Sequence, residues 1–492
     1  MGFNIRVLYT YDKGASFVAR YILTFTTPGG NYVYDREVNS LLSVSDEEFV
    51  SFRRIEEGTD TEEDWGLLRR YTEQGYLQET RLKKIEHPAT CYMPFHLSDY
   101  VSQITLQVTQ DCNLRCKYCT YSGNYTHQRG HEKRVMTLEN MKKSIDFIMR
   151  RSRKVKEINI GFYGGEPFLE IDNIKKCVDY IKQSYKGKTV KYTVTTNGTL
   201  LNDKVVNFLL ENESFSINIS FDGPKELHDI NRVFVDGSGS YDCIMTQVTH
   251  IKNNYPKLFS RMFFLSTVSP GTDLACIAEF YDANDVISDV AATYNTVNTQ
   301  DINESILYDD LYHNTFSYEY MKSLLSAMDK YSKNKVSKLF STNLVDIERL
   351  YDGLGCAVIA EKMHPSGPCL PGVMRPFVSV DGNIYPCERI GEESEIMKIG
   401  HIDTDFDFNK VEVMLNVGTI THEECKVCWN FIHCGLCIAA CDGGSVLSRD
   451  VRLANCHSSK RNTIMNLQTL CLLLENGYDF STRTISKESA GV

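Results

Sequence analysis

The sequence has no long apolar run, no excess of positive charge and no internal repeat. Its most apolar late stretch, Leu467–Leu474, is too short to span a bilayer and contains polar residues. The formal charge of −11 argues against broad nucleic-acid binding and leaves no polybasic patch for a membrane. The first residues also lack the basic and then apolar pattern of a secretory signal. We therefore expect a cytoplasmic protein that binds neither nucleic acid nor membrane.

Cysteine is the residue type that the sequence has in excess. Seventeen thiols in a reducing compartment are poor candidates for disulfides, so ligation of a metal or cluster is the better interpretation. Three lie within residues 112–119, and nine more lie between residues 356 and 456. We interpret the other five as small buried apolar residues. These are Cys91, Cys177, Cys243, Cys276 and Cys471.

The N-terminal region predicts a small α+β unit. Two alternating segments, Tyr21–Thr26 and Tyr32–Val38, flank a TPGGN turn and predict a hairpin. Two helices are expected after it, because Ser45 and Thr61 each precede an acid by three positions, as in a capping box. A third strand before these helices is expected only if Asn4–Tyr9 supplies it.

Strand and helix patterns alternate in the middle of the chain. This alternation predicts βαβ units with right-handed crossovers and a parallel sheet, and so an α/β fold. Functional residues of such sheets gather at the carboxyl ends of the strands, where the motifs described below lie. The expected strands are Ile104–Val108, Ile158–Phe162, Tyr192–Thr195, Phe215–Ser220 and Met262–Val268, with helices such as Leu138–Arg150 and Ile174–Tyr185 between them.

The segment CNLRCKYC follows the first of these strands. Its thiols at Cys112, Cys116 and Cys119 can hold three irons of a cubane cluster. Since no fourth cysteine lies nearby, one iron would stay open to chelation by a substrate or cofactor. A structural zinc site is the alternative, although zinc normally takes four ligands and pairs spaced as CxxC.

This CxxxCxxC segment, with the aromatic Tyr118 before its last cysteine, resembles the signature of the radical S-adenosylmethionine (SAM) superfamily. The resemblance implies a partial (β/α)6 barrel in which SAM chelates the open iron of a [4Fe–4S] cluster. SAM would then be cleaved to methionine and a 5′-deoxyadenosyl radical, which takes a hydrogen from substrate. Tyr118 would lie near the adenine.

Three further segments resemble motifs of the same superfamily. In GFYGGEP, the glycines allow close backbone approach to a ligand, and the carboxylate can accept from the SAM amino group. TTNG resembles a further element of the superfamily. In the segment from Ser220 to Arg232, the Ser220 hydroxyl and the Arg232 guanidinium suit the SAM carboxylate and ribose. Asp222 could equally cap a turn. The implied cofactor-binding positions are Gly164, Gly165, Glu166, Pro167, Thr195, Asn197, Ser220, Asp222 and Arg232.

The C-terminal cysteines resemble the SPASM extension of radical SAM enzymes, which usually holds two auxiliary [4Fe–4S] clusters. The resemblance assigns Cys425, Cys428, Cys434 and Cys456 to a distal cluster, and Cys369, Cys387 and Cys441 to a proximal one. The chain departs from the pattern because Cys437 precedes Cys441, and Cys356 is an extra candidate. The fourth proximal ligand is therefore Cys437, Cys441 or neither, and an open iron there would let a substrate thiolate bind. Two zinc sites are the alternative.

These resemblances imply three domains: an N-terminal α+β domain in residues 1–95, a radical SAM barrel in residues 96–345 and a SPASM domain in residues 346–492. They also imply an enzyme that acts on peptides and takes electrons from a donor such as flavodoxin or ferredoxin. Many maturases of ribosomally made peptides carry an N-terminal domain that grips a leader peptide through an added strand.

We therefore expect a maturase that installs thioether or carbon–carbon crosslinks in a precursor peptide. An anaerobic sulfatase-maturating enzyme, which forms formylglycine, is the alternative within the superfamily. A zinc-binding peptide-interaction protein without catalysis is the alternative outside it.

Overall fold

The computed structural model describes residues 21–299, 302–303, 307–340, 343–365, 367 and 369–482, and its first part is a small α+β unit. Three antiparallel strands lie in the order β1–β2–β3, and two helices follow them. The elements are β1 (Ile22–Thr27), β2 (Gly30–Asp35), β3 (Ser40–Val44), α1 (Asp46–Glu57) and α2 (Glu62–Glu73).

The structure contains the predicted hairpin and both predicted helix starts. The backbone N–H of Ser45 donates to the Glu48 carboxylate at 3.1 Å, and that of Glu48 donates to the Ser45 hydroxyl at 3.3 Å. This capping box satisfies the first turn of α1. The third strand follows the hairpin at Ser40–Val44. The segment Asn4–Tyr9, which we considered for this place, lies outside the described residues.

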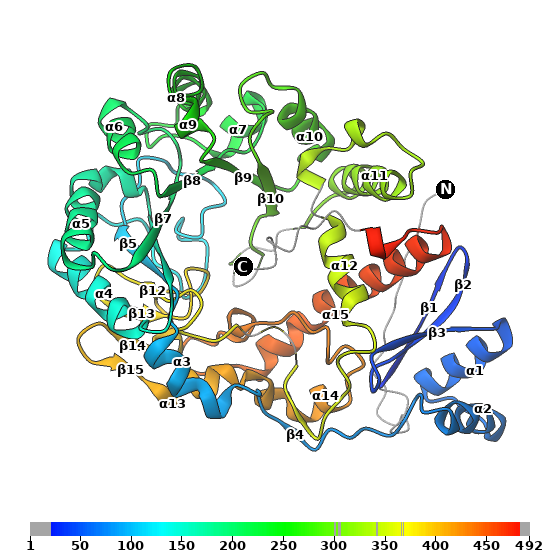
Figure 1. The fold of residues 1–492 in the computed structure, drawn as a ribbon. Helices are drawn as coiled ribbons and strands as arrows, with labels where there is room; N and C mark the ends of the chain where they lie inside the picture. The colour runs from blue at the N-terminus through cyan, green and yellow to red at the C-terminus, as the bar shows by residue number, and fades with distance from the viewer. Residues whose placement is uncertain are drawn as a thin grey trace.

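The middle of the chain forms a curved sheet with helices on its outer side (Figure 1). The strand order is β10-β9-β8-β7-β6-β5-β12-β13-β14-β15, and every neighbouring pair from β10 to β5 is parallel. This confirms the predicted α/β fold, although β10 was not predicted. The parallel strands are β5 (Gln103–Thr109), β6 (Glu157–Gly164), β7 (Thr189–Thr196), β8 (Phe215–Ser220), β9 (Met262–Val268) and β10 (Ala292–Thr296).

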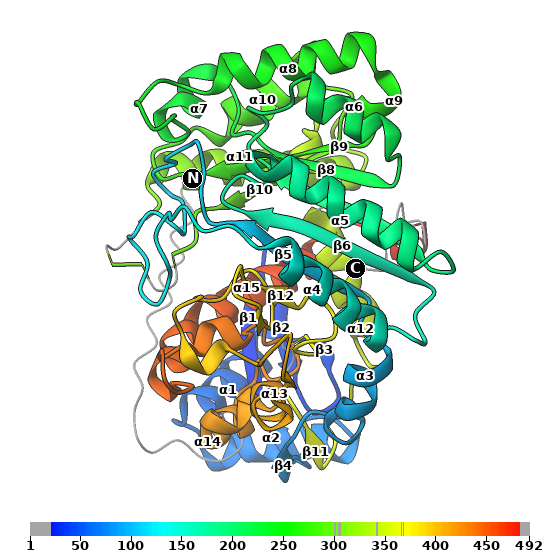
Figure 2. The ribbon, with the colours of Figure 1, turned by 90° about the vertical axis from the view of Figure 1, so that its left-hand side faces the viewer.

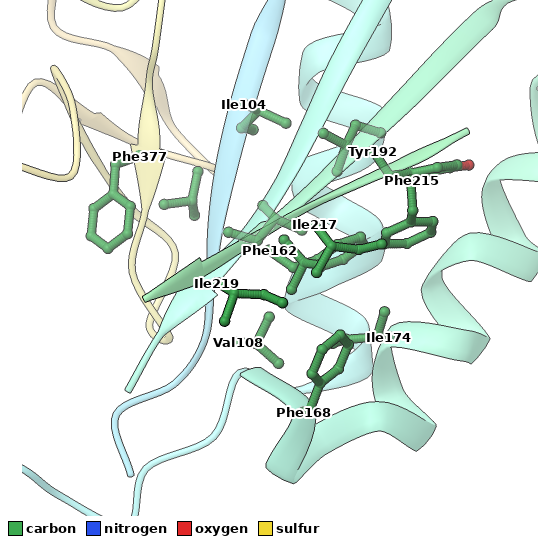
Figure 3. Packing of buried hydrophobic residues seen from close by; sticks show 14 of the residues in the cluster. Ile104, Val108, Phe162, Phe168, Ile174, Tyr192, Phe215, Ile217, Ile219 and Phe377 are labelled. Atoms are coloured by element: carbon green, nitrogen blue, oxygen red, sulfur yellow. The ribbon is translucent and has the colours of Figure 1, made fainter. Parts of the chain in front are cut away.

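Apolar side chains between this sheet and its helices form the main core (Figure 3). The rings of Tyr192 and Phe215 stack with centroids 4.8 Å apart, and Phe162 lies 5.9 Å from Phe215. This packing fixes the neighbouring strands β6, β7 and β8 against one another, and because they are parallel their carboxyl ends lie at one edge. The covering helices are α4 (Leu138–Arg151), α5 (Ile171–Ser184), α6 (Asp203–Glu211), α7 (Lys225–Asn231), α8 (Tyr241–Asn254), α9 (Pro256–Phe259) and α10 (Leu274–Ala283).

The C-terminal region connects the other two parts. Strand β12 pairs in parallel with β5, and β13, β14 and β15 extend the same sheet in antiparallel order. Helix α15 spans 27 residues, about 40 Å, and packs against β1 and α12. Figure 2 shows the orange C-terminal helices beside the blue N-terminal unit. No helix in the described part of the chain is both long and apolar enough to cross a bilayer.

Among the described residues, the remaining elements are six α-helices and six short strands. They are α3 (Met93–Asp99), α11 (Asp310–Ala327), α12 (Asn343–Gly353), α13 (Phe408–Leu415), α14 (His422–Lys426), α15 (Arg449–Glu475), β4 (Lys84–Ile85), β11 (Lys362–Met363), β12 (Phe377–Val378), β13 (Asn383–Tyr385), β14 (Gly400–His401) and β15 (Asp405–Phe406).

Candidate active site

The loop after β5 carries the first cysteine motif. Cys112, Cys116 and Cys119 lie close enough to interact electrostatically. The backbone N–H of Leu114 donates to Cys112 Sγ at 3.4 Å, and that of Tyr121 donates to Cys119 Sγ at 3.4 Å. Burial raises the pKa of Cys112 to about 12 and that of Cys119 to about 11. A bound cation is therefore needed to hold these thiols as thiolates at neutral pH.

Two glycines bring the second motif against this loop. Gly164 has a φ of 138°, and a Cβ there would lie 2.2 Å from the Thr109 carbonyl oxygen. A Cβ on Gly165 would lie 2.0 Å from the Asp111 carbonyl oxygen. Only glycine fits at these two positions. We predicted a close approach of the glycine pair to a ligand; the contact that the structure shows is instead to the backbone that leads into the cysteine loop.

Glu166 is fully buried and connects three of the motifs. Its carboxylate accepts from the backbone N–H of Asn197 at 2.7 Å and from the Thr196 hydroxyl at 2.8 Å. Burial raises the pKa of Glu166 to about 7. The Asn197 side chain donates to Asn113 at 2.8 Å and lies 3.7 Å from Cys112 Sγ. One chain of hydrogen bonds therefore runs from GGEP through TTNG to the cysteine loop.

Tyr118 belongs to a buried polar network with two other predicted residues. Its hydroxyl donates to Asp222 at 2.5 Å and accepts from Arg232 at 2.9 Å. Asp222 also accepts from the backbone N–H of Thr267 at 3.1 Å, so it does more than cap a turn. Burial raises the pKa of Cys116, and the Arg232 guanidinium opposes part of this rise. Arg232 Nε is buried and has no described partner, so one guanidinium N–H is left for a ligand.

The remaining predicted positions lie at the same edge of the sheet. Thr195 is the last residue but one of β7, Ser220 ends the parallel neighbour β8, and Pro167 opens the short turn Pro167–Glu170. Thr196, and not Thr195, contacts Glu166. Side chains alternate between the two faces of a strand, so these neighbouring threonines point to opposite faces.

A buried polar group that the sequence analysis missed lies beside the cysteine loop. Arg129 pairs with Glu392 at 3.1 Å, both side chains being 5% exposed, and its guanidinium lies 3.7 Å from the Tyr121 ring centroid. Gln107 donates to both oxygens of Glu392, at 2.6 and 2.7 Å. Arg129 Nη2 and Gln110 Oε1 are buried without a described partner. No sequence pattern predicted this group, because 263 positions separate the two charged residues.

Four C-terminal cysteines surround one cavity. Cys425, Cys428, Cys434 and Cys456 line a small cavity of about 20 Å³ between the segment around α14 and helix α15. The Cys425 sulfur lies 3.1 Å from the hydroxyl of Thr421. The structure thus brings together the four thiols that the SPASM resemblance assigned to the distal cluster.

A second group of thiols forms around Cys387. Its thiol interacts electrostatically with Cys437 and Cys369, and these two also interact with each other. Cys441, which the pattern placed here, is fully buried, and its sulfur lies 3.3 Å from Arg452 Nη1. Cys441 interacts with Cys437 and Cys434, so it lies between the two groups.

Thiols in groups of three and four, with N–H donors to sulfur, suit iron–sulfur clusters. In the described part of the chain, no three Cys, His, Asp or Glu side chains come close enough together to hold one metal ion. A cubane does not require that closeness, because each thiolate binds a different iron. Cys356 is exposed, and no described interaction joins it to another cysteine.

Comparison with known families identifies the middle of the chain. Residues 106–283 match the profile of the radical SAM superfamily. The matched segment begins in β5 and ends with α10, so it contains the cysteine loop, GGEP, TTNG, Asp222 and Arg232. This match confirms the radical SAM domain that the cysteine motif predicted.

Three relatives extend the comparison. Uncharacterized protein MJ0907 of Methanocaldococcus jannaschii is 31% identical over 183 residues, which cover 37% of this chain and 58% of that protein. The cysteine-type anaerobic sulfatase-maturating enzyme of Clostridium perfringens is 22% identical over 393 residues, or 77% and 96% of the two chains. The radical SAM cyclopropyl synthase TigE of Paramaledivibacter caminithermalis is 27% identical over 250 residues, or 48% and 49%. The chain thus spans little more than half of the first relative's length.

One solved structure shares the fold over most of its length. Native anSMEcpe with bound AdoMet and Cp18Cys peptide aligns with a TM-score of 0.54 at 20% identity, covering 77% of this chain and 99% of that one. About a quarter of the present chain is therefore additional to the shared fold.

Proposed function

From the radical SAM domain that this enzyme carries, we propose that it modifies a ribosomally made peptide by forming a thioether or carbon–carbon crosslink. The observation that supports the radical chemistry is the cysteine loop, in which three half-buried cysteines lie together and Cys112 contacts Asn197 of TTNG, which in turn donates to Glu166 of GGEP. A peptide rather than a small molecule is proposed as substrate because of the buried polar group beside this loop and the N-terminal sheet.

We assign a [4Fe–4S] cluster to Cys112, Cys116 and Cys119, where it would supply, with SAM, a 5′-deoxyadenosyl radical. The surrounding residues orient and bind. Glu166 already accepts from Asn197 and Thr196, so it holds the motifs in place. The unpaired Arg232 N–H suits the SAM carboxylate, since guanidinium–carboxylate hydrogen bonds are among the strongest.

The two C-terminal groups of thiols suit two auxiliary clusters. We assign Cys425, Cys428, Cys434 and Cys456 to the distal one. For the proximal one we propose Cys369, Cys387 and Cys437, since these three interact with one another. Three thiols leave one iron open, which suits the binding of a substrate thiolate during thioether formation. An electron donor such as flavodoxin or ferredoxin would supply electrons.

The buried polar group around Arg129 suits an uncharged amide of the substrate peptide. The charge of Arg129 is already matched by Glu392, so a charged substrate group would add an unbalanced buried charge. A peptide group offers one acceptor and one donor, which match the unpaired Arg129 Nη2 and Gln110 Oε1. Satisfying two buried polar atoms favours binding, because each costs about 1–3 kcal/mol when left unpaired.

The N-terminal sheet suits capture of a leader peptide. Among the described strands, β3 pairs only with β2, while β1 on the other side packs against α15. The outer edge of β3 therefore has backbone groups to which an extended peptide can add as a further strand.

Formation of formylglycine on a sulfatase is the second candidate. It is favoured by the relative from Clostridium perfringens, whose length is 96% covered by this chain. Mass spectrometry separates the two candidates. A crosslink removes two hydrogens and joins two residues of a precursor peptide. Formylglycine formation instead replaces the sulfur of a cysteine by an aldehyde oxygen, or removes two hydrogens from a single serine, in a sulfatase-derived peptide, and fragmentation shows that no two residues are joined.

The radical chemistry is tested with anaerobically reconstituted protein. We expect an iron–sulfur chromophore and the formation of 5′-deoxyadenosine from SAM under dithionite. When Cys112, Cys116 and Cys119 are changed to Ala, the protein should form no 5′-deoxyadenosine and should lose the part of the chromophore that belongs to the first cluster. A zinc protein without catalysis would show neither.

Leader capture is tested by hydrogen exchange: amides of Ser40–Val44 should exchange more slowly with a full precursor than with one that lacks its leader.

A further inference from the structure

A buried arginine lies between the two groups of C-terminal cysteines. Arg452 is fully buried on α15, one turn before Cys456. Its Nε donates to the Thr421 hydroxyl at 3.1 Å, and its Nη1 lies 3.3 Å from Cys441 Sγ. Arg452 also lines the four-cysteine cavity, and its Nη2 is buried without a described partner.

No carboxylate among the described residues pairs with the guanidinium, whose contacts are a hydroxyl and a thiol. Arginine stays protonated in proteins, and a buried charge is costly unless it is compensated. The groups around it that can carry negative charge are the thiols of Cys441, Cys434 and Cys425, with which it interacts electrostatically. Thiolates bound to iron would supply the missing charge.

The two cysteine groups differ in their electrostatic surroundings. Glu388 directly follows Cys387 in the proximal group, and although one oxygen pairs with Arg375, the other is buried without a described partner. In the distal group, Lys460 interacts with Cys428 and Cys456 in addition to the charge of Arg452. The proximal group therefore faces a carboxylate that is paired with Arg375, whereas the cations Arg452 and Lys460 face the distal group.

We propose that Arg452 donates its unpaired N–H to the distal iron–sulfur cluster and raises the reduction potential of that cluster above that of the proximal one. This inference rests on the auxiliary clusters of the proposed function. A nearby cation and a hydrogen bond to sulfur both stabilise the reduced cluster, which carries one more negative charge. The unequal charges make the distal cluster the more favourable location for an electron taken from the substrate.

A purely structural role for Arg452, in which it only links Thr421 to Cys441, is the competing explanation. The two roles differ in what they do to the reduction potential. Changing a structural link alters the stability of the fold or the loading of iron, whereas changing a hydrogen-bonded cation shifts the potential of one loaded cluster.

The test uses the full chain with Cys112, Cys116 and Cys119 changed to Ala, so that only auxiliary clusters contribute. Reduction is followed by electron paramagnetic resonance during a potentiometric titration, with iron and sulfide counted for each sample. Arg452→Lys keeps a charge but loses the planar set of donors, and Arg452→Met loses both. The control is Arg461→Met, which removes an exposed charge from the same helix.

We expect one auxiliary signal to shift to lower potential in Arg452→Lys and further in Arg452→Met, with no shift in the control. Unchanged midpoints in loaded variants would overturn the proposal. If Arg452→Met does not load iron, the proposal is judged from Arg452→Lys alone: an unchanged midpoint potential in iron-loaded Arg452→Lys would overturn it. Loss of the fold in both variants would overturn it too. A parent protein that binds no iron would instead contradict the auxiliary clusters themselves.

Discussion

The Arg36 guanidinium donates to the backbone carbonyl oxygen of Cys428 at 3.1 Å. The same nitrogen donates to the carbonyl oxygen of Lys426 at 2.8 Å, and the other terminal nitrogen donates to the Thr80 hydroxyl at 2.8 Å. Arg36 is fully buried and forms an ion pair with Glu37. The N-terminal unit is therefore anchored directly to the loop that carries a proposed ligand of the distal cluster.

Replacing Arg36 by Met is expected to lower the free energy of unfolding by about 3–5 kcal/mol, because the buried Glu37 carboxylate loses its ion-pair partner. The loop around Cys428 would also lose two of its hydrogen bonds, so less iron should be retained in the distal site. Urea unfolding and iron analysis of the reconstituted protein measure both effects. Arg53→Met, which removes an exposed ion pair with Glu57, should change stability by at most about 1 kcal/mol. An equally small effect of Arg36→Met would contradict the anchoring role.

Cys437→Ser and Cys441→Ser distinguish the two candidates for the proximal cluster. In the background that lacks the first cluster, Cys437→Ser should lose about four of about eight irons per chain. Cys441→Ser should keep them, because Cys441 contacts Arg452. Iron and sulfide analysis after anaerobic reconstitution provides the measurement. The reverse result would assign Cys441 to the cluster and remove Cys437.

Glu166→Gln is expected to change the pH dependence of stability. Burial raises the pKa of Glu166 from 4.5 to about 7, so the folded protein holds this proton more tightly than the unfolded chain. The contribution of Glu166 to stability is therefore greatest below about pH 4.5 and falls by about 3 kcal/mol as the pH rises to about 7. Thermal unfolding at about pH 5 and about pH 7.5 should show wild type losing stability relative to the variant. Parallel pH profiles would show that Glu166 titrates normally.

Arg129→Met is expected to uncouple SAM cleavage from peptide modification. Without the guanidinium, the substrate amide loses its partner, and the ratio of modified peptide to 5′-deoxyadenosine should fall at least about tenfold. Both products can be quantified in one sample by mass spectrometry. Arg134→Met removes an arginine that is 48% exposed and pairs with Asp381, and it should leave the ratio unchanged. Equal ratios in all three proteins would show that Arg129 does not contact the substrate.

The strands that were predicted correctly are long and rich in β-branched or aromatic residues, as in Met262–Val268. Strand β10, Ala292–Thr296, was missed because it is short and none of its residues is buried. Strands β12 to β15 contain only two or three residues each. Such short segments become strands only because distant parts of the chain supply their hydrogen-bond partners.

The sequence alone indicated the radical SAM domain through its resemblance to the motifs of that superfamily, and the local spacing of Cys112, Cys116 and Cys119 already specifies which thiols can share one cluster. Local patterns also determined the capping box of α1 and the alternation of strands and helices in the parallel sheet. Only the tertiary structure decided that Cys437 lies with Cys369 and Cys387, and that Arg129 meets Glu392. These contacts join residues that are far apart in the sequence. Such contacts leave no periodic pattern in the sequence on either side of each residue, so local patterns cannot predict them.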